Sequence, residues 1–212
     1  MVLRAKDFIR NNAAAISSVE DVAKASLKWF YYQRASMPLE ARHAGKWTRA
    51  AGHMDDKVIV YGTDKETAAN FAAATGTKEV KNPKKKVIKS PRGWYDAGDY
   101  GKYVVNSGIT VFTLLEIYEH FPKYADTLQW NIPREFAKLP MLLEEVRYNL
   151  DWMLTMQDSD GGVYHKVSCA SFCGMIMPHE EKEELILSPV STTATGDFAA
   201  CMAMAARYYA DI

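Results

Sequence analysis

The stretch from residue 93 to residue 103 reads Gly93-Trp94-Tyr95-Asp96-Ala97-Gly98-Asp99-Tyr100-Gly101-Lys102-Tyr103. It places two carboxylates three residues apart on a glycine-containing turn, among aromatic residues and ahead of a long apolar segment. Asp and Gly are common in ordinary turns, so Asp-x-Gly-Asp alone would say little. The aromatic rings offer flat apolar faces for pyranose rings, and the carboxylates can act as bases on a water molecule. The stretch therefore predicts a site that cleaves a sugar.

Three further blocks extend this pattern along the chain. The first lies near the start and reads Trp29-Phe30-Tyr31-Tyr32-Gln33-Arg34. The second ends in Gln157-Asp158-Ser159-Asp160-Gly161-Gly162-Val163-Tyr164-His165, and the third begins Ser188-Pro189-Val190-Ser191-Thr192-Thr193-Ala194-Thr195-Gly196-Asp197-Phe198-Ala199-Ala200. In order and spacing, from about residue 20 to the end, the four blocks resemble glycoside hydrolase family 9, the inverting endo-β-1,4-glucanases.

The resemblance implies a fold and a place within it. Members of this family fold as an all-α (α/α)6 barrel of six helix pairs, and their general-acid Glu lies close to the C-terminus of that barrel. The last predicted helix of this chain resembles one near the middle of the barrel. Residues 1–212 are therefore expected to form about the first half of a single catalytic domain, which carries the base and lacks the acid.

The resemblance also assigns roles to individual residues. Asp99 is the expected general base, and Asp96 helps to fix the attacking water. In an inverting enzyme the acid and the base stand roughly 6.5–9.5 Å apart across the sugar, so two carboxylates of one turn share the same side of the site. Trp94 and Tyr95 are candidates to stack on sugar rings. His165, which follows a glycine pair on a loop, is a candidate to hydrogen-bond a substrate hydroxyl.

Plainer structural readings exist for several of these residues. Either Asp96 or Asp99 could cap the helix that opens near Tyr103, since Asp is a favoured cap. Trp94 could pack beneath the turn instead of facing substrate. Asp197 is expected to be a first-turn charge of the last helix.

Metal ligands are only partly indicated, and the expected reaction requires no cofactor. Asp158 and Asp160 resemble a fragment of a calcium loop without its full ligand spacing, which favours a plain turn but leaves a structural calcium open. In some members of the family a Cys-His pair helps to hold a structural zinc near the position of Gly52-His53. Gly52 stands here in the place of that Cys, which argues against a zinc.

Composition restricts the partners. Lys+Arg and Asp+Glu both number 26, so no excess charge favours nucleic acid or an anionic membrane, and a neutral polysaccharide fits. The cysteines, Cys169, Cys173 and Cys201, give no disulfide framework. No apolar run is long enough to span a membrane, and charges within residues 1–18 interrupt any signal-peptide apolar region. The family resemblance implies a secreted or periplasmic protein.

The hydrophobic periodicity predicts helices and no major sheet. Four long helices are expected: about 17–35 with a capping box beginning at Ser17, about 105 to before Pro122, about 140–156, and from after Thr195. One or two helical turns are expected over 67–74, and a further short helix over 1–15. Between residues 36 and 100 little periodicity is found, and a loop of this length is usually functional or disordered.

Two classes of function follow from these patterns. The first is an enzyme part that hydrolyses cellulose or a related β-glucan such as xyloglucan. The second is a non-catalytic carbohydrate-binding or structural fragment. If the chain is half a barrel, its alanine-rich face over residues 198–206 is expected to lack a partner. Alone, the chain is then expected to be inactive and to aggregate or pair, either with a second copy or with the C-terminal half.

Overall fold

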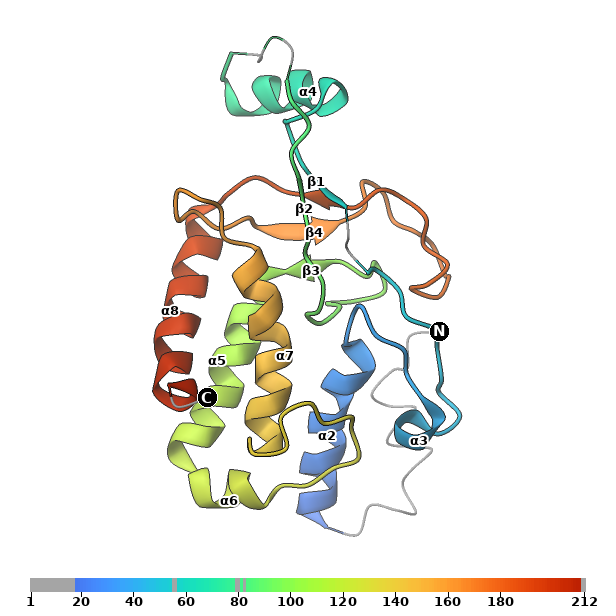
Figure 1. Cartoon of the computed structure of the whole chain (residues 1–212), viewed down its shortest axis with the longest axis vertical. Coiled ribbons are helices and arrows are strands. Elements are labelled where there is room, and N and C mark those ends of the chain that lie inside the picture. The colour runs from blue at the N-terminus through green and yellow to red at the C-terminus, as the bar shows by residue number, and fades with distance from the viewer. Residues whose placement is uncertain (1–17, 55–56, 79–80, 82, 211–212) are drawn as a thin grey trace.

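Four long helices form the body of the molecule, and a small sheet lies across one end of them (Figure 1). The computed structural model describes residues 18–54, 57–78, 81 and 83–210. Helix α5 packs against both α7 and α8. The long helices are α2 (Val19–Gln33), α5 (Val104–His120), α7 (Met141–Thr155) and α8 (Thr192–Tyr209), and the shorter ones are α3 (Ala41–Ala44), α4 (Lys65–Thr75) and α6 (Pro122–Thr127).

The predicted helices are confirmed, with two shifts at their starts. The capping box of α2 uses Ser18 and Asp21, one residue later than expected. Ser17 and the predicted helix over 1–15 lie outside the described residues. Helix α8 starts four residues earlier than expected, because the Ser191 hydroxyl accepts a hydrogen bond from the backbone N–H of Ala194 and caps it there. Asp197 therefore lies beyond the first turn, so its predicted first-turn role is wrong.

The structure adds a small sheet to the predicted helices. Five strands pair in the order β2-β1-β5-β4-β3, with β1 and β5 parallel and the other neighbours antiparallel. Each strand has only two or three residues, too few to show the alternating pattern that reveals a strand in sequence. The strands are β1 (Val58–Val60), β2 (Val87–Ile88), β3 (Lys102–Tyr103), β4 (Lys166–Ser168) and β5 (Ile186–Leu187).

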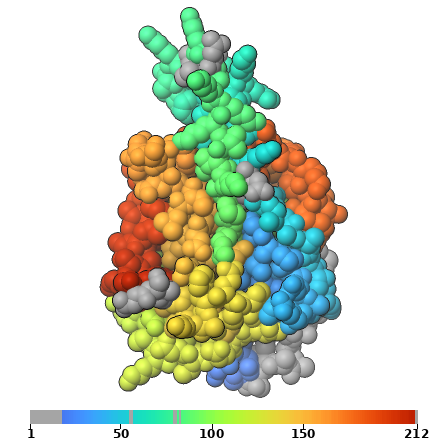
Figure 2. Space-filling model, viewed as in Figure 1, coloured from blue at the N-terminus to red at the C-terminus, as the bar shows by residue number. Residues whose placement is uncertain are grey.

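Nearly half of the predicted long loop, residues 58–88, is an arm that rises from this sheet. Strands β1 and β2 pair with each other, and α4 stands at the far end, clear of the body (Figure 2). Asp64 caps α4 by accepting from the backbone N–H groups of Glu66 and Thr67, and Gly76 ends the helix at a φ of 68°. The helical turns predicted over 67–74 are therefore confirmed as an eleven-residue helix.

Helix α7 is the centre of the core. Eleven of its fifteen residues are buried, so it has almost no solvent-facing side. Three of the buried ones are polar: Glu144, Glu145 and Asn149. Buried polar groups need partners, and those partners link α7 to the rest of the molecule.

Among the helices of the described ranges, none is long and apolar enough to cross a bilayer.

The alanine-rich side of α8 is exposed as expected. Ala199, Ala203 and Ala206 are exposed and lie on one face of the helix, whereas Ala205 is buried. The neighbouring α5 also exposes Ile109 and Phe112, at 64% and 47% of their surface. We predict that the isolated chain associates through this face. Light scattering on residues 1–212 is expected to give a mass above the monomer, and Ala203→Glu is expected to reduce it. A wild-type chain that stays monomeric at high concentration would contradict this prediction.

Candidate active site

The Asp96–Asp99 turn lies between the chain that leaves helix α2 and strand β3, and backbone hydrogen bonds hold it there. Its entry pairs with the chain that leaves α2: the N–H of Tyr95 donates to the carbonyl of Gln33 at 2.8 Å, and that of Ala35 to Gly93 at 2.9 Å. The turn closes on itself where the Asp96 N–H donates to the Gly101 carbonyl at 2.9 Å. The entry and the exit of the turn are therefore both fixed by backbone hydrogen bonds.

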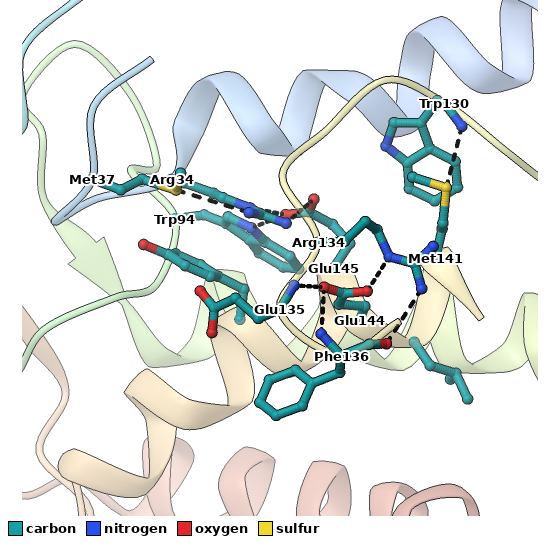
Figure 3. A network of polar contacts seen from close by, with 12 residues as sticks. Arg34, Met37, Trp94, Trp130, Arg134, Glu135, Phe136, Met141, Glu144 and Glu145 are labelled. Atoms are coloured by element: carbon teal, nitrogen blue, oxygen red, sulfur yellow. Dashed lines mark hydrogen bonds and ion pairs between the residues drawn. The ribbon is translucent and has the colours of Figure 1, made fainter. Parts of the chain in front are cut away.

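A buried network holds Trp94 beneath the turn (Figure 3). Its indole N–H donates to Glu145 Oε1 at 3.0 Å, and its backbone N–H donates to Asn149 at 3.1 Å. Both acceptors come from α7. Glu145 is also paired with Arg34, which closes α2, through two bonds of 3.1 and 2.9 Å. Trp94 is only 5% exposed. This placement matches the reading in which the indole supports the turn from below, and Trp94 also borders a hollow next to the turn.

The two carboxylates of the turn have different partners. Asp96 is exposed, and its Oδ1 accepts from the Asn106 amide at 2.7 Å. Asp99 is half-buried; its Oδ1 accepts from the Gly101 N–H at 3.2 Å and its Oδ2 from the Tyr103 hydroxyl at 2.6 Å. Neither carboxylate caps α5, whose N-cap is Tyr103 without any side-chain cap bond. The alternative in which one of them caps this helix is therefore wrong.

Two hollows adjoin the turn and meet along the same wall. The first has a volume of about 180 Å³, reaches Asp96, and is bordered by Trp29, Phe30, Gln33, Trp94, Tyr95, Asp96, Asn106, Ser107 and Thr110. The second has a volume of about 140 Å³ and adds Tyr32, Trp47, Arg49 and Tyr100, among others. Trp29, Gln33 and Tyr95 border both. Tyr95 therefore lies between the hollows, next to the turn, although only 4% of its surface is exposed, about as little as for Trp94.

His165 reaches the same end of the molecule through the sheet. Its carbonyl accepts from the N–H of Val104 at 3.0 Å, directly after Tyr103. Its ring Nδ1 lies 3.2 Å from the Ser191 hydroxyl, and the side chain is half-buried. The structure therefore brings four of the five predicted site residues, Asp96, Asp99, Tyr95 and His165, to one end of the bundle, with the fifth below them.

Comparison with known proteins decides the family. The sequence model of glycosyl hydrolase family 9 matches residues 20–212. The chain belongs to this family. A xyloglucan-specific endo-β-1,4-glucanase of Bacteroides ovatus is 43% identical over 212 residues, which is 97% of this chain and 34% of that protein. The chain thus spans about a third of the length of this relative.

Solved structures of glycosyl hydrolase family 9 agree with that assignment. The Bacteroides ovatus structure matches with a TM-score of 0.78 and 41% identity, covering 90% of this chain and 32% of that one. A family 9 structure in complex with a cellobiose-like isofagomine matches with a TM-score of 0.73 and 35% identity, over 90% of this chain and 32% of that one.

Four residues other than glycine have a positive φ among the described residues, and all belong to the support of the turn. They are Ser36, His53, Arg92 and Tyr100, with φ between 49° and 68°. The Ser36 hydroxyl connects three of these segments: it donates to the His53 carbonyl at 2.6 Å and accepts from the Arg92 N–H at 3.1 Å. Such backbone strain is concentrated at functional sites, where the surroundings force it.

The zinc that some members of the family hold does not fit the residues at Gly52 and His53. A side chain at residue 52 has no room, because an added Cβ would lie 2.5 Å from the carbonyl carbon of Pro178. His53 Nδ1 lies 3.0 Å from the Tyr95 hydroxyl, and its buried Nε2 has no hydrogen-bond partner among the described residues. No group of three His, Cys, Asp or Glu side chains that could hold a metal ion occurs within the ranges given above.

Asp158, the main candidate for a calcium ligand, is occupied by protein groups. Its carboxylate accepts from the Lys86 ammonium and from the Tyr164 hydroxyl, each at 2.6 Å. The bond from Lys86, followed by that from Tyr164, holds the pKa of Asp158 well below its usual range. Asp160 accepts from the N–H of Gly162 and closes the turn. The geometry is that of a turn tied to β2, whose preceding residue is Lys86.

Burial sets the protonation of His53. It holds the pKa of the imidazole at about 4, below the ordinary value of 6.5; Lys102 and Arg49 act in the same direction, and Glu181 opposes them. Between pH 6.5 and pH 4 the unfolded chain therefore binds a proton that the folded chain does not, so stability falls as the pH drops through this window. We predict a loss on the order of 2 kcal/mol in the free energy of unfolding, after allowance for partial exposure of the ring.

The measurement is urea unfolding at pH 7 and pH 4.5 for the wild type and for His53→Gln. Glutamine does not titrate, so the variant is expected to show the smaller difference between the two pH values. Equal pH dependence in both proteins would show that His53 is not the group responsible.

Sequence reasoning missed the residues that hold the carboxylates. Tyr103 ends the motif and Asn106 follows it, and their only signal was this proximity to the turn. Glu145 and Asn149 gave no signal, because a polar residue inside an apolar helix pattern is normally taken to face solvent. Their spacing of four residues places both on the side of α7 that meets Trp94.

Proposed function

We propose that this chain provides the general-base side of an active site that hydrolyses β-1,4-glucosidic bonds with inversion. Asp99 accepts a proton from the attacking water, and Asp96 fixes that water from the same turn. The observation that carries the proposal is the pair of carboxylates on one turn, each with its own donor, of which Asp96 borders a hollow together with Trp29 and Tyr95. The general acid must then come from a part of the barrel that these residues do not supply.

The substrate class follows from the relatives and the lining of the hollows. Aromatic faces and hydrogen-bonding side chains suit a neutral β-glucan chain. Because one relative is xyloglucan-specific, we propose cellulose or a related β-glucan such as xyloglucan as the substrate. Tyr95 and His165 are the proposed substrate contacts. The chain would work as the N-terminal part of a single (α/α)6 catalytic domain, with its C-terminal half as partner, outside the cytoplasm.

The test is hydrolysis by the active species that contains this chain. Cellotetraose and a xyloglucan oligosaccharide are supplied separately, and new reducing ends are measured. Proton NMR at early times identifies the anomer of the first product, which is expected to be the α-anomer for inversion at a β-linkage. A β-anomer would overturn the inverting mechanism.

The second candidate, a non-catalytic carbohydrate-binding fragment, has one observation in its favour: the chain spans only 34% of the length of a family 9 relative. It predicts binding of cellotetraose, measurable by calorimetry, with no new reducing ends. Turnover by the active species that is lost in Asp99→Asn would exclude it.

A further inference from the structure

Tyr103 makes the shortest contact to the proposed base. Its hydroxyl donates to Asp99 Oδ2 at 2.6 Å, while the Gly101 N–H donates to the other oxygen at 3.2 Å. Both donors come from the four residues that follow Asp99 in the chain. Gly101 makes this possible: an added Cβ there would lie 2.7 Å from the Tyr103 ring and 3.1 Å from Asp99 Oδ2. A glycine lets the ring fold back over the turn and reach the carboxylate.

The Tyr103 ring is itself held in place. Its backbone pairs with Lys166 across strands β3 and β4, and the Lys166 ammonium lies 5.2 Å from the ring centroid. The next residue, Val104, begins α5 and donates its N–H to His165. The phenol is therefore fixed by a strand, a helix start and a cation before any substrate binds.

The hydroxyl also remains a donor over the working range of a hydrolase. Burial, and then the hydrogen bond to Asp99, raise the pKa of Tyr103 above that of an ordinary tyrosine. The phenol thus stays protonated in neutral and mildly alkaline solution. Because this O–H occupies one lone pair of Oδ2, it determines the directions in which the remaining lone pairs of Asp99 can accept a proton.

We propose that Tyr103 is a positioning residue for hydrolysis: its hydroxyl holds Asp99 in the orientation from which it takes a proton from water. This inference rests on the proposed role of Asp99 as the base. Asn106 has the corresponding contact with Asp96, at 2.7 Å. It belongs to the first turn of α5 and Tyr103 to the N-cap, so one helix start orients both carboxylates.

The test is Tyr103→Phe in the active species that contains this chain. Removing one hydroxyl is expected to lower kcat about tenfold and leave KM within twofold, because substrate contacts are untouched while base alignment is lost. The matched control is Tyr118→Phe. Tyr118 also donates to a carboxylate, Asp126 Oδ1 at 3.1 Å, but near the opposite end of α5. The Tyr118→Phe variant is expected to leave kcat and KM unchanged.

A second measurement does not depend on activity. Tyrosine labelled with ¹³C at Cζ reports the ionisation of each phenol by NMR in residues 1–212. In Asp99→Asn the pKa of Tyr103 is expected to fall relative to the wild type, because the charged acceptor is gone, while burial and the charge of Asp96 still raise it. The signal of Tyr118 is expected to be unchanged.

Each outcome decides the inference. A kcat of Tyr103→Phe within twofold of the wild type would overturn it. So would a fall in kcat that is accompanied by a lower melting temperature, because a general structural role would produce both. If Asp99→Asn is inactive while Tyr103→Phe is fully active, only the role of Tyr103 is wrong. If Asp99→Asn itself retains hydrolysis, the proposed function fails first, and the role of Tyr103 with it.

Discussion

Asp99→Asn is expected to lower the rate of β-glucan hydrolysis by about 10² to 10⁴-fold, since this is what a positioned general base typically contributes. The amide has nearly the same shape as the carboxylate and can still accept the bond from Tyr103, so oligosaccharide binding should remain almost intact. The measurement is kcat and KM on a soluble β-glucan, with binding followed separately by calorimetry, in the active species that contains this chain.

Two further variants make this result specific. Asp96→Asn is expected to lower the rate of hydrolysis comparably or somewhat less, because it weakens the hydrogen bond to the attacking water without removing the proton acceptor. Asp126→Asn removes a carboxylate with the same kind of tyrosine partner, far from the turn, and should have no effect. If Asp99→Asn keeps more than half of the wild-type rate, the assignment of Asp99 as the base is wrong.

Glu145→Gln is expected to have the largest effect on stability. Glu145 is 0% exposed and Arg34 is 2% exposed, so the variant leaves a buried guanidinium without its counter-charge. Breaking a buried ion pair in this way typically costs about 3–5 kcal/mol. The indole of Trp94 shares the same carboxylate, which extends the damage to the support of the turn. Urea unfolding of the chain measures the change.

The control for this prediction is an exposed ion pair. Lys85 and Glu184 lie 2.8 Å apart with side chains 47% and 62% exposed, and Glu184→Gln is expected to cost less than about 1 kcal/mol. The double variant Arg34→Met, Glu145→Leu should recover part of the lost stability, because it removes both buried charges together. A loss below about 1 kcal/mol for Glu145→Gln would show that water reaches Arg34 in solution.

The parts of the fold that could be predicted are those with local signals. Helices α5 and α7 were bounded nearly to the residue by Pro122 and Pro140 and by their apolar periodicity. The sheet could not be predicted, because strands as short as β2 and β3 exist only through their pairing with distant segments.

The residues of the site also differ in whether local sequence signals reveal them. Asp96, Asp99 and Tyr95 could be named because they belong to one contiguous motif. The burial of Trp94 could be given only as one of two alternatives, since it depends on acceptors from Glu145 and Asn149, more than fifty residues later in the chain. Prediction from sequence therefore names the groups that do chemistry more readily than the groups that orient them.

The arm also bears on how this protein could change over evolution. Its two ends are cross-strand neighbours, with Val58 opposite Ile88 and the N–H of Val60 bonded to the carbonyl of Lys86 at 2.9 Å. A segment whose ends already touch can be lengthened, shortened or exchanged without moving the strands that it joins. Insertions and deletions among homologues should accordingly be concentrated between residues 61 and 85, and this segment is the natural place to graft a loop, a label or a second module.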